Sequence, residues 1–528
     1  MTWIARSVLL IAAVLCGCAS LPPGADFPKT ESSALAHPEE TRLGRQYARD
    51  VAVHPGTSGF HLLSMGVDGF LTRVQMVNAT EKTLDLQYFI FRNDDTGLLL
   101  LDAVLRAADR GVRVRLLIDD GDTVSGDEQI RALAAHPNIE VRIFNPFVYR
   151  GHAELFRGIE FMLNKPRLDY RMHNKLFVAD NSIALVGGRN IADEYFQVNP
   201  EAQFADDDVF TAGPMVQRLS AIFDEFWKCS LAIPVEALPG GKPPAEALTA
   251  YRKTLEQHRL QMKEEGVAFA ARIATGEPFA SLLSGKLPLV WASAQLVYDS
   301  PEKKKVEKGE KVGRLMHRAV ADAAASVTGE LLMTSPYFIP GEDGMKLLKD
   351  LRDRNVRVRV LTNSLVSTNE LAAQAGYMRY RVPLLQDGIE LYEIRALLGN
   401  TRGSGETKAI SEYGNYGLHA KVFVFDRKRV YIGSMNFDQR SEHLNTEIGM
   451  IIDSPVLAQQ AAARFEAMTQ PANSYVLALR PGDAASPKLS WRTVEGGKPV
   501  DYREEPARNE GERFKAKLLS LLPLDAEL

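Results

Sequence analysis

One short polar motif occurs twice in this chain, and the repetition constrains the fold more than any other feature. The first copy contains His173-Asn174-Lys175, Asp180 and Gly187-Gly188-Arg189-Asn190, and the second contains His419-Ala420-Lys421, Asp426 and Gly433-Ser434-Met435-Asn436. Both copies fit the pattern H-x-K-x4-D-x6-G-(G/S)-x-N. A single match to its first part should arise by accident in roughly one chain in several hundred of this length. The chain therefore carries one half-site twice.

The similarity between the two halves extends beyond this motif. Three further segments recur, namely 88–90 (YFI) as 337–339 (YFI), 112–117 (VRVRLL) as 356–361 (VRVRVL), and 139–141 (IEV) as 389–391 (IEL). After each motif an acidic residue stands eight positions before a proline, Asp206 in the first half and Glu447 in the second. The two halves are therefore duplicated domains.

The pattern around these landmarks predicts an α/β fold. Residues 83–91, 112–118 and 139–144 form short β-branched runs, and residues 97–109 and 128–135 between them have helical character. This alternation favours βαβ units and a largely parallel or mixed sheet. Domains of about 180 residues lie within the usual size range. We expect a signal segment at 1–17, a leader at 18–61, domains at 62–238 and 290–470, a connection at 239–289, and a C-terminal extension at 471–528.

Strand geometry predicts which motif residues act together. Side chains two apart on a strand share a face, so His173 and Lys175 project together, as do His419 and Lys421. Asp180 and Asp426 fall at odd offsets on regular strands. We expect these two aspartates to support the site without touching the reacting atom.

The paired residue types suit attack on a phosphodiester. A neutral imidazole can attack phosphorus, while a second, protonated imidazole gives a proton to the leaving group. Lysines and asparagine amides, including Asn190 and Asn436, supply donors for the growing negative charge. We expect Asp206 and Glu447 each to hold a ring nitrogen of the histidine in its own half, which fixes the tautomer.

The paired motif resembles the hallmark of the phospholipase D superfamily over roughly residues 62–470. The resemblance implies tandem α/β/α sandwich domains that share one pseudo-twofold active site, a covalent phosphohistidine intermediate, and no metal or other cofactor. By analogy His173 is the nucleophile and His419 the acid, although the sequence alone does not order them. The segments 433–441 (GSMNFDQRS) and 444–447 (LNTE) are similar to bacterial cardiolipin synthases, and 171–175 (RMHNK) and 186–191 (VGGRNI) to their C-type members.

The predicted site therefore has two groups of residues. The catalytic group is His173, Lys175, Asp180, His419, Lys421 and Asp426, and the supporting group is Asn190, Ser434, Asn436, Asp206 and Glu447. The second half has Ser434 where the first has Gly188, so only one half supplies a hydroxyl. The two sides of the site are therefore not expected to be equivalent.

The N-terminus predicts a location in the cell envelope. Arg6 precedes an apolar run at 8–14, and 15–18 (LCGC) has the form of a lipoprotein processing site. The run is too short to span a membrane and is typical of a cleaved signal segment. Cleavage before Cys18 would leave a lipid-bearing N-terminus. Since Ala19 and Ser20 lack an aspartate that retains lipoproteins at the inner membrane, similarity implies the periplasmic face of the outer membrane.

The composition argues against one class of substrate, and three further features of the sequence each allow two interpretations. The 63 basic and 67 acidic residues give a net charge of −4, so no global basic field favours nucleic acid. Arg440 and Asp438 form either a structural ion pair or a substrate contact. The lysine-rich run at 301–308 is expected to be an exposed loop, although it could meet anionic headgroups. The amphipathic C-terminal helix, with Phe514 and Leu518 on one face, either docks on the core or lies on a membrane.

These observations together favour a phosphatidyltransferase acting at a membrane surface. Its expected product is cardiolipin, made from phosphatidylglycerol and a second phospholipid, with phosphatidylethanolamine as a possible donor. The alternative is that the same site hydrolyses phospholipids or nucleic acid. The two reactions differ only in whether an alcohol or water resolves the covalent intermediate. An envelope lipoprotein that binds lipid without turnover is the alternative from another class. The sequence leaves open the acceptor, the oligomeric state and any accessory protein.

Overall fold

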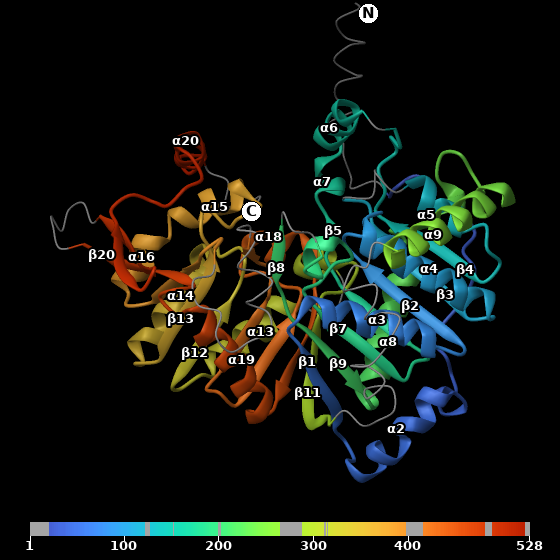
Figure 1. The fold of residues 1–528 in the computed structure, drawn as a ribbon, viewed down its shortest axis with the longest axis horizontal. Helices are drawn as coiled ribbons and strands as arrows, with labels where there is room; N and C mark the ends of the chain where they lie inside the picture. The colour runs from blue at the N-terminus through green and yellow to red at the C-terminus, as the bar shows by residue number, and fades with distance from the viewer. Residues whose placement is uncertain are drawn as a thin grey trace, which may run out of the picture.

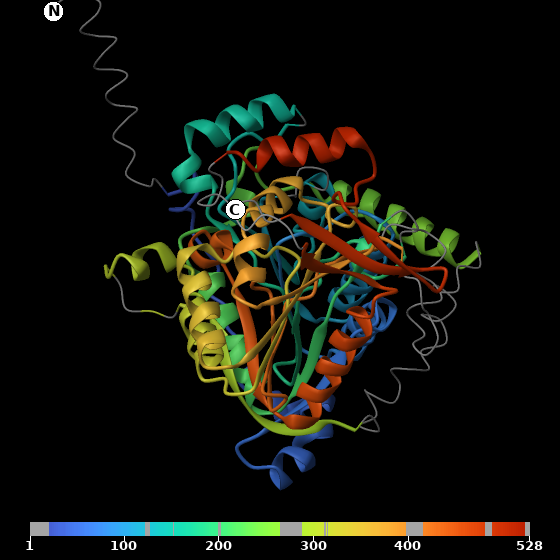
Figure 2. The ribbon, with the colours of Figure 1, turned by 90° about the vertical axis from the view of Figure 1, so that its left-hand side faces the viewer.

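The computed structural model describes residues 21–121, 127–151, 153–198, 202–264, 288–310, 313, 315–397, 416–480 and 488–522. Two α/β halves lie side by side, the first coloured blue to green and the second yellow to red (Figure 1). This arrangement confirms the predicted tandem α/β fold. Figure 2 shows the same molecule from the side of the second half.

The first half is built on a mixed sheet with the strand order β10-β4-β3-β2-β6-β7-β9-β1. The strands β2, β3 and β4 are parallel and the others are antiparallel to their neighbours. Their bounds are β1 (Ser58–Leu63), β2 (Thr83–Tyr88), β3 (Arg113–Asp119), β4 (Ile139–Phe144), β6 (Leu176–Ala179), β7 (Ile183–Gly187), β9 (Asp208–Ala212) and β10 (Ala232–Pro234). The parallel strands are almost continuously buried, which explains their apolar runs.

The second half repeats this order as β20-β14-β13-β12-β16-β17-β19-β11. The bounds are β11 (Val290–Tyr298), β12 (Glu330–Thr334), β13 (Arg357–Asn363), β14 (Glu390–Ile394), β16 (Val422–Phe425), β17 (Arg429–Gly433), β19 (Ile448–Asp453) and β20 (Ser474–Leu479). Two more strands, β21 (Leu489–Glu495) and β22 (Lys498–Tyr502), extend the sheet beyond β20. Because β1 pairs with β11, the two sheets are continuous across the middle of the molecule.

The structural repeat corrects one of the sequence correspondences. Arg113 and Arg357 occupy equivalent first positions of β3 and β13, as the 112–117 and 356–361 repeat predicts. The YFI correspondence is wrong by two positions, because Phe91 bridges to Ile191 where Phe338 bridges to Phe437. The three identical residues therefore recur by chance at positions that are not structurally equivalent.

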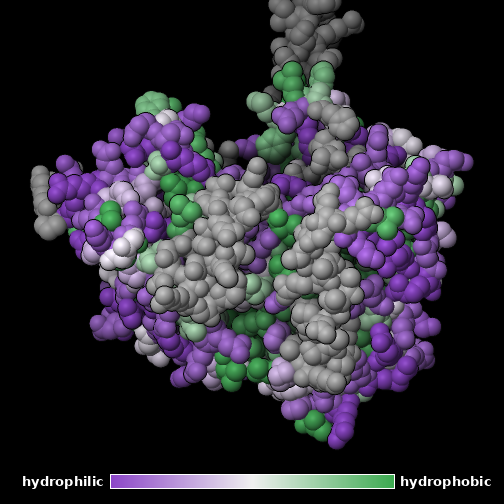
Figure 3. All heavy atoms as spheres, viewed as in Figure 1, coloured by the Kyte–Doolittle hydropathy of each residue, from purple (hydrophilic) through white to green (hydrophobic). Residues whose placement is uncertain are grey.

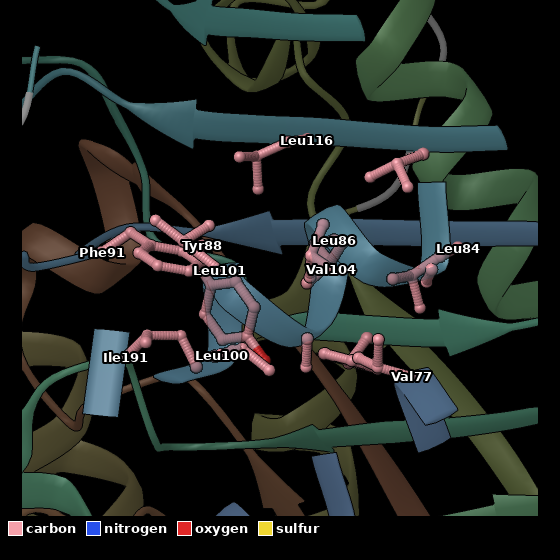
Figure 4. Close-up of a cluster of buried hydrophobic side chains, with 14 of the residues drawn as sticks. Val77, Leu84, Leu86, Tyr88, Phe91, Leu100, Leu101, Val104, Leu116 and Ile191 are labelled. Atoms are coloured by element: carbon pink, nitrogen blue, oxygen red, sulfur yellow. The ribbon is translucent and has the colours of Figure 1, made fainter. Parts of the chain in front are cut away.

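Helices cover both faces of the sheet and define three cores. In the first half α3 (Gly66–Ala79) and α4 (Asp95–Asp109) bury residues such as Val77, Leu100 and Leu101 against Leu86 and Leu116 (Figure 4). Full burial of each large aliphatic side chain contributes about 1.5–3 kcal/mol. The second half has an equivalent core under α13 (Met316–Ala325) and α14 (Gly341–Asp353).

The third core is shared by the two halves. It packs α8 (Pro214–Lys228) and α19 (Pro455–Met468) against β6, β7, β16 and β17. Trp227 of α8 and Phe465 of α19 belong to this single apolar cluster. Separation of the halves would expose it, so the halves are held as one unit.

The remaining helices lie around this framework. They are α2 (Arg42–Val53), α5 (Asp127–Leu133), α6 (Glu154–Leu163), α7 (Lys165–Leu168), α9 (Ala245–Glu264), α12 (Lys303–Glu307), α15 (Leu371–Met378), α16 (Arg381–Gln386), α18 (Gln439–His443) and α20 (Glu510–Leu519), with short 3₁₀ turns η1 (Pro38–Glu40), η3 (Asp193–Tyr195) and η4 (Val235–Ala237). The α9 helix of the connecting segment packs on α4 and α5, and α20 packs on α15. Within the described residues, no helix is both long and apolar enough to cross a bilayer.

Candidate active site

Two short pairs of strands connect the halves at the carboxyl edge of the sheet. The pair β5 (Arg171–Met172) and β18 (Asn445–Thr446) is parallel, as is the pair β8 (Gln203–Ala205) and β15 (Tyr416–Leu418). Each pair places a motif histidine beside the acidic residue of the opposite half. The His173 N–H donates to Thr446 O at 2.9 Å, and the His419 N–H donates to Ala205 O at 2.8 Å.

The histidine–acid pairs therefore cross between the halves. Nδ1 of His173 lies 2.9 and 3.0 Å from the two carboxylate oxygens of Glu447, and Nδ1 of His419 lies 2.7 Å from Oδ2 of Asp206. The prediction that each acid serves its own half was wrong, because β5 and β8 pair with strands from the other half. With Nδ1–H donating to a carboxylate, the lone pair of each imidazole lies on Nε2, and Nε2 of His419 lies 3.2 Å from Nζ of Lys421.

One cavity of about 300 Å³ receives side chains from both halves. His173 and His419 both line it, which places the two motifs in a single site. The other lining residues are Phe89, Ile90, Asn190, Tyr195, Tyr337, Asn369, Glu370, Ala373, Asn436, Asp438, Arg440 and Asn445. Aromatic edges position both imidazoles, since Phe89 packs against His173 and Tyr195 against His419. The shared site predicted from the duplicated motif is present in this geometry.

The two motif lysines contact the backbone of the histidines and are almost fully buried. Lys175 Nζ donates to the carbonyl of His173 at 2.6 Å, and Lys421 Nζ donates to the carbonyl of His419. Burial lowers the pKa of Lys175 well below its usual value and the pKa of Lys421 to about 8. Neither lysine is among the residues that line the cavity, but an anionic ligand there would favour the protonated form of both lysines, which would in turn stabilise its charge.

The same environment lowers the pKa of both histidines. Burial is the largest cause, and the neighbouring lysines add to it, so the pKa of His173 falls well below its usual value and that of His419 falls to about 3. Both imidazoles are therefore neutral in the empty cavity. An anionic phosphodiester in the cavity would favour a protonated imidazole and so raise these pKa values.

The two acids have different environments. Burial opposes ionisation of Asp206, but His419 and Lys421 outweigh it and lower the Asp206 pKa to about 2. Burial raises the pKa of Glu447 to about 7, although Ser434 and Ser441 both donate hydroxyl hydrogen bonds to its carboxylate. The two sides of the site therefore differ, as predicted, and the difference includes the pKa values of these two acids.

The glycine at the position equivalent to Ser434 has a steric reason. A Cβ atom at Gly188 would lie 2.1 Å from Oδ1 of Asp206, so a serine does not fit there without a shift of the acid. Oδ1 of Asp206 instead accepts the Asp207 N–H at 2.8 Å. The first half therefore replaces a hydroxyl donor with a backbone donor.

The motif aspartates lie away from the cavity. Asp180 accepts the backbone N–H groups of Glu81, Lys82 and Thr83 at 2.7–2.9 Å. Asp426 makes the equivalent contacts to residues 328–330 at 2.7–3.0 Å. Their assignment to the catalytic group was wrong, whereas the expectation of a supporting role agrees with this geometry. They fix the turns that lead into β2 and β12.

The two motif asparagines are also unequal. Asn190 is fully engaged, because Oδ1 accepts the Ile90 N–H at 3.1 Å and Nδ2 donates to Tyr195 Oη at 3.0 Å. Asn436 lines the cavity, and its buried Oδ1 has no hydrogen-bond partner among the described residues. The second-half asparagine is thus the freer of the two to meet a ligand.

The structure shows the contacts of Arg440 and Asp438, for which the sequence left two alternatives open. Arg440 pairs with Asp169, and Asp438 caps α18 by accepting the Ser441 N–H at 2.7 Å. Both Arg440 and Asp438 line the cavity. Of the two alternatives left open by the sequence, a contact with the substrate therefore remains available to both residues.

The lysine-rich run is not simply an exposed loop. Lys303 is fully buried, and its Nζ donates to Asp299 Oδ2 at 3.0 Å, Ser441 O at 2.7 Å and Asn445 O at 2.8 Å. Asp299 Oδ2 also accepts the Glu447 N–H at 3.1 Å. Lys303 therefore positions the chain that precedes Glu447, and it also holds Asp299, which accepts the Glu447 N–H. The neighbouring Lys305 is exposed, as predicted.

Two predicted features receive no direct structural test. The signal segment at 1–17 and the lipidation residue Cys18 lie outside the described residues. In the part of the chain that the structure describes, no cluster of three or more His, Cys, Asp or Glu side chains is placed to hold a metal ion.

Comparisons with known proteins agree with this geometry. The family described as "Cardiolipin synthase, PLD-like domain" matches residues 74–227 and 321–469. The chain is 36% identical over 480 residues to cardiolipin synthase C of Escherichia coli (strain K12), which covers 89% of this chain and 96% of that protein. It is 30% identical over 479 residues to an uncharacterized protein of Helicobacter pylori, which covers 91% of each. The crystal structure of phosphatidylserine synthase from Haemophilus influenzae Rd KW20 has a similar fold, with a TM-score of 0.51, 13% identity, and coverage of 82% of this chain and 92% of that chain.

Proposed function

The chain belongs to the cardiolipin synthase family of the phospholipase D superfamily and is a phosphatidyltransferase, and we propose that it makes cardiolipin from phosphatidylglycerol and a second phospholipid. The observation that carries the proposal is the pair of histidines, His173 and His419, that line one cavity with their Nδ1 atoms held by buried carboxylates. This arrangement leaves one Nε2 for attack and the other for proton transfer.

In the first step Nε2 of His173 attacks the phosphorus of a donor phosphatidylglycerol. A P–N bond forms and the bond from phosphorus to the glycerol headgroup breaks. His419, which takes up a proton from solvent when the anionic donor binds, gives that proton to the departing glycerol oxygen. With phosphatidylethanolamine as donor, ethanolamine leaves in the same way. Lys175 and Lys421 stabilise the negative charge on the phosphoryl oxygens.

In the second step neutral His419 takes the proton from a headgroup hydroxyl of a second phosphatidylglycerol. That oxygen attacks phosphorus, a P–O bond forms, and the P–N bond to His173 breaks. The products are cardiolipin and the freed headgroup, and both histidines return to their starting states.

The unequal acids support this order of roles. Asp206 has a pKa of about 2 and is therefore ionised at neutral pH, so it favours the imidazolium form of His419. Glu447, with a pKa of about 7, is a weaker stabiliser of a positive charge on His173. His173 is thus better suited to remain a neutral nucleophile, and His419 is better suited to carry the proton.

Hydrolysis is the second candidate function, because water can resolve the same intermediate. Phosphatidic acid would then replace cardiolipin as product.

We also propose that cleavage before Cys18 and its lipidation hold the protein at the periplasmic face of the outer membrane, near its phospholipid substrates.

The test supplies purified protein with vesicles that contain phosphatidylglycerol, with or without phosphatidylethanolamine, and measures lipids by mass spectrometry. We expect cardiolipin and the freed headgroup to accumulate together, with phosphatidic acid as the minor product. The His173→Ala and His419→Ala proteins are the matched controls. Phosphatidic acid as the main product, despite abundant acceptor lipid, would reject the synthase assignment.

A further inference from the structure

The helix α6 exposes an apolar face to solvent. No side chain of α6 is buried, although its sequence is strongly amphipathic. The exposed apolar residues recur at helical spacing and include Met162, 80% exposed, and Leu155, 72% exposed; the others are Phe156, Ile159 and Leu163. A contiguous exposed apolar face of this kind marks a surface that binds another apolar phase.

The helix α20 exposes a second apolar face. Ala516 is its one fully buried residue among those described, and the helix packs there against α15. Phe514 and Leu518 are 67% and 55% exposed, and Leu521 and Leu522, just beyond the helix, are exposed as well. The helix therefore docks on the protein through a small contact and leaves its large apolar side chains outside.

Both helices adjoin segments that form the active site. The α6–α7 segment leads directly into β5 and His173. On the other side, Asn369, Glu370 and Ala373, at the start of α15, line the cavity beneath α20. Figures 1 and 2 agree that α6 and α20 project from the same end of the molecule, and hydrophobic atoms mark both projections in Figure 3.

The shape and charge of these projections fit a lipid bilayer. Two convex helices from different halves, at one level and with the site between them, match a flat partner better than a peptide, which would need a groove. On α20 Glu510 pairs with Arg513 and Glu512 pairs with Arg508, while Lys515 and Lys517 are exposed beside the apolar residues. Exposed lysines next to an apolar face favour anionic headgroups.

The start of the described chain lies near the same edge. Lys29 Nζ donates to Cys229 O, and Asn145, which follows β4, donates its N–H to Leu231 O. The segment after Leu21 therefore lies beside the carboxyl end of β4. The proposed lipid anchor at Cys18 is three residues from Leu21, about 10 Å of extended chain.

We propose that α6 and α20 are docking helices that insert their apolar faces into the interfacial layer of a phospholipid bilayer. The cavity between them then faces the headgroups, and a substrate reaches the histidines without leaving the membrane. This proposal rests on the proposed function in that the substrate is a phospholipid, and the proposed lipid anchor at Cys18 adds support to it.

The first test places the photocrosslinking residue benzoylphenylalanine in the full chain at Met162, at Leu518, or at Val53. Val53 is a matched control because it is 64% exposed and ends α2, at the opposite end of the molecule. With vesicles of phosphatidylglycerol and phosphatidylethanolamine, we expect lipid adducts from positions 162 and 518 and none from position 53. Equal adducts from all three positions, no lipid adducts from either helix, or adducts to a protein would overturn the proposal.

The second test compares the Met162→Glu/Leu518→Glu protein with the Val53→Glu protein. We expect the double variant to lose at least about tenfold in activity on vesicles and to keep its activity on short-chain phosphatidylglycerol dispersed as monomers. Equal losses on both substrates, with an unchanged melting temperature, would overturn the proposal. If the unmodified protein makes no cardiolipin from either substrate, the synthase proposal fails, while the crosslinking result still decides the docking surface.

Discussion

The two histidine–acid pairs are related by duplication but differ in chemistry. His419 faces Asp206, whose pKa is lowered to about 2, while His173 faces Glu447, whose pKa is raised to about 7. Asp206 has a backbone N–H as a further donor, and Glu447 has two hydroxyls. The duplicated fold supplies two equivalent positions, and local burial and hydrogen bonding then fit them for two different steps.

The crossed pairing also makes each half dependent on the other. Neither half contains both a motif histidine and the acid that holds it, because β5 pairs with β18 and β8 pairs with β15. An isolated half would therefore lack an oriented imidazole. This dependence explains why the duplication yields one site and not two.

The largest effect should come from the histidines themselves. Replacement of His173 or His419 by Ala should lower turnover of lipid by at least about 10⁴-fold, because the nucleophile and the proton donor act in every cycle. Steady-state lipid assays measure this loss, and circular dichroism checks that the variants remain folded. Near-normal activity in either variant would show that the two histidines do not act together in one catalytic site.

Replacement of the acids should separate the two sides. We expect Asp206→Asn to lower turnover by about 10²- to 10³-fold, because His419 loses the charge that stabilises its imidazolium. Glu447→Gln should lower turnover by only about tenfold, since Glu447 is partly neutral near pH 7. Equal losses, measured at the same pH with unchanged melting temperatures, would contradict the division of roles.

Loss of the Ser434 hydroxyl should change the pH profile more than the maximal rate. The hydrogen bond from Ser434 lowers the pKa of Glu447, so Ser434→Ala should raise that pKa further above 7. If ionised Glu447 holds the Nδ1–H tautomer of His173, activity rises with pH through this pKa. The acidic limb of the kcat profile should therefore move to higher pH, with a loss of a few fold near pH 7. If the acidic limb of the Ser434→Ala profile stays at the pH of the unmodified protein, this role for Glu447 is wrong.

The motif aspartates should have the smallest effect on chemistry. Asp180→Asn and Asp426→Asn weaken hydrogen bonds to the turns before β2 and β12, so each should reduce the free energy of unfolding by about 1–3 kcal/mol. Activity below the melting temperature should stay within a few fold of the unmodified protein. A loss comparable to that of Asp206→Asn, without loss of stability, would return these residues to the catalytic group.

The sequence predicted the fold and the reacting side chains because both depend on local pattern. Apolar runs and helical segments alternate along each half. The strand argument for His173 and Lys175 was wrong, because both residues lie between β5 and β6, although Lys175 Nζ still contacts the His173 carbonyl. The partner of each imidazole could not be predicted in this way. Asp206 and Glu447 stand at equivalent positions, and the choice between them depends on which strands meet across the halves.

Other long-range contacts of buried or partly buried polar side chains could not be predicted for the same reason. Lys303 lies in a charged run that is typical of an exposed loop, yet tertiary contacts bury it against the backbone of Ser441 and Asn445. Arg440 is close in sequence to Asp438 but finds Asp169, which is distant in sequence. Long-range pairing of buried polar groups is set by the assembled fold and leaves little trace in residue spacing.

The most direct test of the account is the position of the covalent intermediate. A phosphatidyl ester of p-nitrophenol, with ³²P in the phosphate, needs no proton on its leaving group, so His419→Ala should still form the intermediate but resolve it slowly. Acid-free digestion and mass spectrometry then locate the phosphorylated residue. The account predicts label on His173 in this variant and none in His173→Ala. Label on His419 in the His173→Ala protein, with none on His173 in the His419→Ala protein, would contradict it.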